Sequence, residues 1–179
     1  MTSFSKILIA GLLVGGVSVP ALAQVTAGQS TTASITIIRP IVLTKTNDLV
    51  FGAITRPAAG TNTVTMSAAS DTPTTSVANS LITTGAGSTR NRASYTVTGE
   101  TGRTVAISVD DTTPTLTRSG GAETLDVTLA LESATDTLTG GNGDFSGDGI
   151  YYIGGEIAIP AATVTGAYSG SFTTTVAYN

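Results

Sequence analysis

The sequence contains no cysteine, no histidine and no tryptophan, and only 11% of its residues are charged. No disulfide can therefore stabilise the fold. The sequence also excludes Ser-His-Asp and Cys-His catalytic groups, and metal sites built from thiolate or histidine ligands. Lysine occurs only at Lys6 and Lys45, and the net charge is −4. This argues against a nucleic-acid partner, because phosphate binding needs clustered basic residues. The composition predicts neither an enzyme nor a cofactor-binding protein.

Long apolar runs are also absent, apart from one at the N-terminus. That run, Ile7–Val19, follows Lys6 and precedes Ala-Leu-Ala at 21–23. A basic residue, a short apolar segment and an A-x-A site are the pattern of a secretory signal peptide. The run is too short and too rich in glycine for a membrane span, which needs about 20 apolar residues. We therefore predict a signal peptide over residues 1–23, cleavage before Gln24, export of the mature protein and no integral membrane span.

After this segment, apolar and polar residues alternate with a period of two, and no window shows the helical repeat. The runs are rich in Thr, Val, Ile and Tyr, which strands prefer. The predicted strands are Ser34–Ile38, Ile41–Phe51, Thr63–Ser67, Ala93–Thr98, Thr104–Val109, Glu123–Leu131, Ile150–Ile159 and Ala167–Tyr178. Clusters of Gly, Pro, Asn and Ser between them indicate turns. The pattern predicts an all-β protein, an antiparallel immunoglobulin-like β-sandwich over residues 40–179.

Two acidic residues are the only candidates for carboxylate catalysis. Asp110 and Asp111 could serve glycoside cleavage, which uses a carboxylate pair. Neighbouring residues of a strand point to opposite faces, however, and Pro114 follows closely. We interpret the pair as the end of a hairpin.

A glycine-rich segment resembles the start of a calcium loop. Asn142, Asp144, Ser146 and Asp148 place oxygen atoms at alternate positions. The downstream bidentate acid is missing at the expected spacing, since the next one is Glu156 in a predicted strand. A tight turn explains the same residues. We therefore favour a turn and keep a calcium site as the weaker alternative.

Two other features are interpreted as structural. Residues 68–92 contain many small polar residues and predict a surface loop, in which Arg90 and Arg92 are solvated. Tyr151 and Tyr152 form the one aromatic doublet. If they lie in a strand, one of them faces outward and is a candidate contact residue.

The two ends of the mature chain carry the clearest alternation. Ala33, Ile35 and Ile37 alternate with small polar residues, and Pro40 separates them from the next extended run. A proline between two alternating segments suggests an N-terminal extension, residues 24–39, ahead of the first strand of the domain. The alternative is one long, bent first strand. At the C-terminus, residues 172–178 alternate in the same way.

Four segments in order resemble a known bacterial family. They are Leu43–Gly52 (LTKTNDLVFG), Tyr95–Gly99 (YTVTG), Ile153–Ile157 (IGGEI) and Gly166–Asn179 (GAYSGSFTTTVAYN). The chain thereby resembles domain-of-unknown-function family 4402, which is itself similar to spore-coat-U-like proteins and archaic chaperone–usher pilins. Those pilins are exported as incomplete immunoglobulin folds. The resemblance covers nearly all of the mature chain.

The C-terminus resembles the pilin pattern in particular. Pilins of that class have a penultimate aromatic residue, a glycine fourteen residues from the end and apolar positions between them. Here these are Tyr178, Gly166, and Val176 with Phe172. The resemblance implies that this strand faces the core or a chaperone. Thr174 departs from the pattern, because an aliphatic residue is usual there, and the disulfide common in pilins is absent.

The resemblance also implies a function. A sandwich that lacks a strand exposes an apolar groove with unpaired backbone groups, which the extension of the next subunit fills by donor-strand complementation. Ala33, Ile35 and Ile37 would be the donor residues of a homopolymeric fimbria-like filament at the cell surface. A periplasmic chaperone and an outer-membrane usher would be its partners, and cell adhesion its role. The alternative is a monomeric secreted binding module, in which residues 25–38 complete their own sheet.

Overall fold

The computed structural model describes residues 27–140 and 146–179, in two units. The first unit ends at Thr36, and its described residues, 27–36, are exposed and form neither helix nor strand. The second unit, Ile37–Asn179, holds all the strands given below. The predicted signal peptide and its cleavage site lie outside the described residues. Within the two described ranges, no helix has the length and apolarity needed to cross a membrane.

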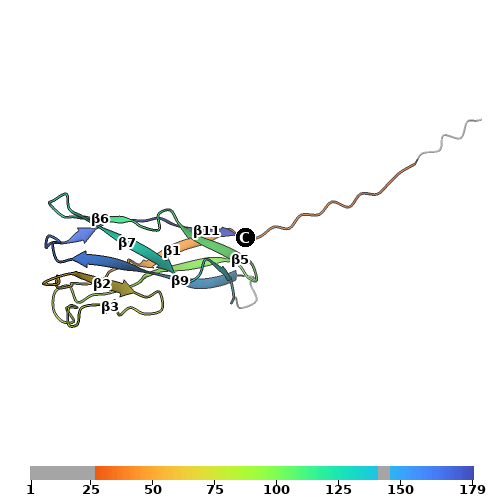
Figure 1. Ribbon diagram of the computed structural model, residues 1–179. Helices are drawn as coiled ribbons and strands as arrows, with labels where there is room; N and C mark the ends of the chain where they lie inside the picture. Colours follow the sequence, from red (N-terminus) through yellow and green to blue (C-terminus); the bar gives the residue numbers. More distant parts are fainter. Residues whose placement is uncertain (1–26, 141–145) are drawn as a thin grey trace, which may run out of the picture. The chain divides into compact units, whose positions relative to one another are not determined.

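The second unit consists of antiparallel strands in two sheets (Figure 1). The strands are β1 (Val42–Asn47), β2 (Thr61–Met66), β3 (Thr74–Thr75), β4 (Ala93–Glu100), β5 (Thr104–Val109), β6 (Thr115–Arg118), β7 (Thr124–Leu131), β8 (Thr135–Thr137), β9 (Ser146–Pro160), β10 (Tyr168–Ser169) and β11 (Thr174–Tyr178). The larger sheet has the order β1-β4-β9-β7-β6-β10, and β2, which carries β3, pairs with the second half of β9. The smaller sheet has the order β11-β5-β8. The prediction of an antiparallel all-β fold is confirmed.

Alternating burial explains why these segments form strands. In β7, Val127 and Leu129 are buried while Asp126 and Thr128 are exposed, so one face of the strand is apolar and the other polar. Two apolar clusters form the interior. The first consists of Val64, Ala93, Tyr95, Val127, Leu129, Ile153 and Ile157, and the second of Val97, Val105, Ile107, Leu138 and Tyr151. The second cluster draws side chains from both sheets, which makes the fold sandwich-like.

The predicted strands at the two ends of the chain differ from the structure. Residues 34–38 form no strand, because they enter none of the ladders among the described residues. The run predicted as 41–51 ends at Asn47, where the pairing with β4 has already shifted register. The run predicted as 167–178 is divided, because β10 pairs with β6 of the larger sheet and β11 pairs with β5 of the smaller one.

Three strands were not predicted from the sequence. β3, β6 and β8 have two, four and three residues, which is too short for a period-two pattern to be recognised. Each is held by its pairing with a longer strand, β2, β7 and β5 respectively.

The prediction that Arg92 is solvated is wrong. Its guanidinium carbon lies 3.5 Å from the centroid of the Tyr152 ring, and Nη1 donates to the Ala68 carbonyl at 2.5 Å. Nε lies 3.4 Å from Asp71 Oδ1, and the side chain is only 17% exposed. Arg92 thus attaches the segment between β2 and β4, which was predicted as a loop over residues 68–92 and contains β3, to β9. Tyr151 is buried on the other face of that strand, so the two tyrosines point to opposite faces, as predicted, but Tyr152 is half-buried against Arg92.

Candidate functional site: an apolar groove

A groove with a volume of about 830 Å³ lies over the inner face of the larger sheet. Its floor is apolar and comes from β4, β6, β7 and β9. The floor residues are Ala93, Tyr95, Leu116, Leu125, Val127, Leu129, Ile157 and Ile159. Two segments form its walls: the first wall is residues 48–56, which follow β1, and the second wall is residues 163–172, which include the short strand β10 and precede β11.

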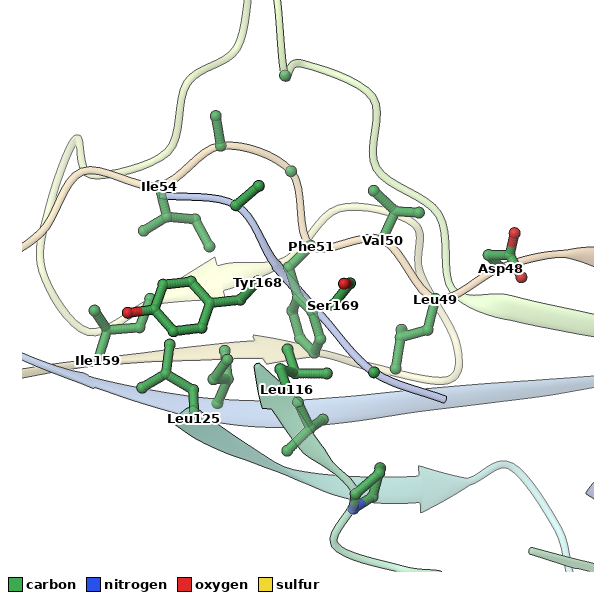
Figure 2. Close-up of a pocket in the computed structure, with 18 of the residues that line it drawn as sticks. Asp48, Leu49, Val50, Phe51, Ile54, Leu116, Leu125, Ile159, Tyr168 and Ser169 are labelled. Carbon is green, nitrogen blue, oxygen red and sulfur yellow. The ribbon is translucent and has the colours of Figure 1, made fainter. Parts of the chain in front are cut away.

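Aromatic side chains from both walls enter the groove. Figure 2 shows Phe51 from the first wall and Tyr168 from the second wall, both reaching over the floor. The Tyr168 hydroxyl donates to the Val164 carbonyl at 2.7 Å, which holds the second wall in its bend. Val164 also lines the groove and is 41% exposed, so the groove opens to the surface at this wall.

The first wall directs its backbone hydrogen bonds away from the groove. The Val50 N–H donates to the Asn91 carbonyl and the Ala53 N–H to the Gly87 carbonyl, both at 2.7 Å. Gly52, between these two residues, has a φ of 84°, so the wall is not a regular extended strand. Phe51 has no backbone–backbone hydrogen bond within the described part of the chain.

The strands beside the walls also have an open edge. Among the described ladders, β1 pairs only with β4, and β11 only with β5. Leu43 of β1 and Val176 of β11 pack against the same apolar cluster. An unpaired edge beside apolar surface is a template for adding a strand. The edges of β1 and β11 are therefore both able to accept an added strand.

Three charged side chains of the groove, Lys45, Asp48 and Arg56, are held by neighbouring groups. Lys45 Nζ lies 2.6 Å from Asp48 Oδ1, and this hydrogen bond raises the pKa of Lys45. Arg56 Nη1 donates to the Thr163 carbonyl at 3.0 Å and so connects the two walls. Both ion-pair partners are exposed, so the pair contributes little to stability.

The C-terminal residues singled out by the resemblance lie along the groove and the second apolar cluster. Phe172 lines the groove and packs against the first cluster. Val176 and Tyr178 pack against the second cluster, while Thr175 and Ala177 are exposed. Gly166 lies in the second wall with φ of +154°, where a Cβ would come within 2.9 Å of Arg118 Cδ.

The predicted donor residues are exposed. The side chains of Ile35 and Ile37 are 85% and 84% exposed, and Ala33 is exposed as well. Isolated exposed apolar residues are common, but these two are large and lie at alternate positions of one segment. As a strand they would present one apolar face.

Apart from Gly166 and Phe172, the residues that shape the groove were not singled out from the sequence. Leu116 lies in a strand too short to be predicted, and Phe51, Ile54 and Tyr168 lie in segments whose pairing partners are remote in sequence. The alternation in β7 and β9 was the one available signal, because it showed which of their side chains face inward.

The acidic candidates have structural partners where they are described. Asp110 Oδ1 accepts the Thr173 N–H at 2.7 Å, and this hydrogen bond lowers the pKa of Asp110. Asp111 Oδ1 accepts the Thr113 N–H at 2.8 Å, which closes a turn. The calcium candidates Asn142 and Asp144 lie outside the described residues, as does the side chain of Asp148. The described residues include no acidic cluster that could hold a metal ion.

Comparison with known proteins gives the family but no characterised relative. No curated protein matches the chain. A family model with the description "Domain of unknown function (DUF4402)" matches residues 41–178, which is most of the chain and includes both walls and the floor of the groove. The chain therefore belongs to the DUF4402 family, as its sequence motifs indicated.

Proposed function

We propose that this protein is the structural subunit of an extracellular surface filament, in which the N-terminal extension of one subunit fills the groove of the next. One observation carries the proposal. The same chain has an apolar groove, open edges on β1 and β11, and an extension in which two exposed isoleucines, Ile35 and Ile37, occupy alternate positions. Burying one such side chain contributes about 1.5–3 kcal/mol, and an added strand also satisfies the open backbone edges.

The extension and the groove have matching chemistry. Residues 24–38 contain no charged side chain, and burying an unpaired charge in an apolar site would cost several kcal/mol. In extended form residues 27–38 reach about 40 Å, which is enough to follow β1 and part of the first wall. Ala33, Ile35 and Ile37 would face the floor, and Ser34 and Thr36 would face outward.

The order of the elements along the chain favours a filament over a closed dimer. The extension joins the domain before β1 begins, whereas the first wall follows the end of β1. The donor and the acceptor are therefore two different surfaces of one subunit. Such a heterologous contact generates an open chain of subunits unless a rotation happens to close it.

The resemblance to archaic chaperone–usher pilins supports the cellular setting. A predicted signal peptide implies export, and an open apolar groove needs protection before assembly. We accordingly propose that the domain is an incomplete immunoglobulin-like sandwich. In this setting a periplasmic chaperone delivers the subunit to an outer-membrane usher, and the mature protein acts in cell adhesion at the surface.

A matched pair of substitutions in the extension tests the proposal. Ile37→Asp places a charge on the face that enters the groove, and Thr36→Asp places the same charge on the opposite face. We expect Ile37→Asp to be exported and folded with an unchanged melting temperature but to remain monomeric. We expect Thr36→Asp to assemble as the wild type does. Size-exclusion chromatography, negative-stain microscopy and thermal melting measure these outcomes.

Two results would contradict the proposal. Filaments formed by Ile37→Asp in wild-type amounts would show that Ile37 is not a donor residue. Unfolding of Ile37→Asp would show that residues 34–38 complete the sheet of their own domain. If Ile37→Asp unfolds and the wild-type protein is always monomeric, the protein is a secreted binding module instead.

A further inference from the structure

The side chain of Tyr178, near the end of β11, holds the residue at which the extension joins the domain. Its hydroxyl donates to the Arg39 carbonyl at 2.9 Å and accepts the Glu100 N–H at 2.7 Å. The Arg39 N–H in turn donates to Glu100 Oε2 at 3.1 Å. Both backbone polar groups of Arg39 are therefore bonded to the domain, at the ends of β4 and β11.

The surroundings are shaped for this contact. A Cβ on Gly99 would lie 2.5 Å from the Tyr178 hydroxyl and 2.9 Å from Leu138 Cδ1, so only glycine leaves room for the ring. The ring itself packs against the second apolar cluster. Pro40 restricts the backbone of Arg39 to extended conformations. We call Arg39, Glu100 and Tyr178 the clamp.

We propose that the clamp transfers tension from the extension into the domain when subunits are joined in a filament. This inference rests on the proposed function. Any pull on a donor segment held in a neighbouring groove reaches its own domain through Arg39. Beyond Arg39 comes β1, an edge strand that has a single partner and a register shift within its six residues. Without the clamp, β1 alone would resist peeling. With it, β4 and β11 share the tension, and Tyr178 and Glu100 are positioning residues for the extension.

The first experiment needs no filament. Amide hydrogen exchange is measured on the monomeric protein, either Ile37→Asp or the wild type if that is monomeric, with and without Tyr178→Phe. Phenylalanine keeps the packing of the ring and removes only the hydroxyl. We expect exchange of the Arg39 and Glu100 amides to rise about fivefold. Tyr168→Phe, which loses a hydroxyl bonded to Val164, is the matched control and leaves both amides unchanged.

The second experiment measures the role under tension. Filaments of Tyr178→Phe are expected to form in wild-type amounts, but their subunits unfold about fivefold faster at constant force. Glu100→Ala leaves Tyr178 intact and removes the carboxylate that accepts the Arg39 N–H. It is also expected to raise the unfolding rate at constant force, so the result does not depend on how well Tyr178→Phe folds. Unchanged exchange of the Arg39 and Glu100 amides in monomeric Tyr178→Phe would show that the Tyr178 hydroxyl does not hold Arg39. Equal unfolding rates under force would overturn its role in the filament, and a lack of wild-type filaments would overturn the proposed function alone.

Discussion

A synthetic peptide of residues 25–39 is expected to bind the groove and stabilise the monomeric Ile37→Asp protein. Ile35 and Ile37 are 85% and 84% exposed in the chain, and burying both contributes about 3–6 kcal/mol. Hydrogen bonds to the open edges add to this value, whereas ordering the peptide subtracts from it. At a concentration 100-fold above its dissociation constant, a peptide that binds only the folded state stabilises it by about 2.7 kcal/mol. For a domain of this size, that raises the melting temperature by about 8 °C.

Scanning calorimetry with three peptides measures the effect. The native peptide and a Thr36→Asp peptide are expected to raise the melting temperature equally, because residue 36 faces away from the floor when 35 and 37 face it. An Ile35→Asp peptide is expected to leave it within about 1 °C of the protein alone, because the charge would be buried without a partner. Equal shifts from all three peptides, or no shift from the native one, would refute the assignment of the groove to the extension.

Three further predictions concern maturation, packing and pH. Intact mass of the exported protein is expected to place its N-terminus at Gln24, and a product that retains Lys6 would disprove the signal peptide. Gly154→Ala is expected to lower the free energy of unfolding by about 3 kcal/mol or more in denaturant titrations, because its Cβ would overlap the Met66 carbonyl oxygen; an unchanged midpoint would contradict this packing. Since the pKa of Asp110 is lowered in the folded state, its contribution to stability is present above pH about 4 and is lost on further acidification. Asp110→Asn is therefore expected to lose stability less steeply than wild type between pH 4 and pH 2, and parallel curves would exclude this contribution.

The sequence by itself determined the class of fold and the positions of most long strands. The strand predicted at Thr104–Val109 has the same bounds as β5, and Glu123–Leu131 differs from β7 by one residue. Both lie on a half-buried sheet, where each residue alternates between an apolar and a polar environment. That alternation involves only neighbouring residues, so it can be recognised from the sequence alone. The family motifs were recognisable for the same reason, because they are contiguous segments.

Only the tertiary structure decided which segments pair, and therefore where the groove lies. β10 and β11 form one alternating run in the sequence, yet they pair with different sheets because their partners, β6 and β5, belong to different layers. Tyr178 was recognised as an apolar residue of the last strand, but its hydroxyl bonds Arg39, 139 residues away. Hydrogen bonds and cavities between segments remote in sequence depend on how the strands are stacked. A period-two pattern specifies which face of a strand is buried, but not which neighbour covers it or whether its edge stays open.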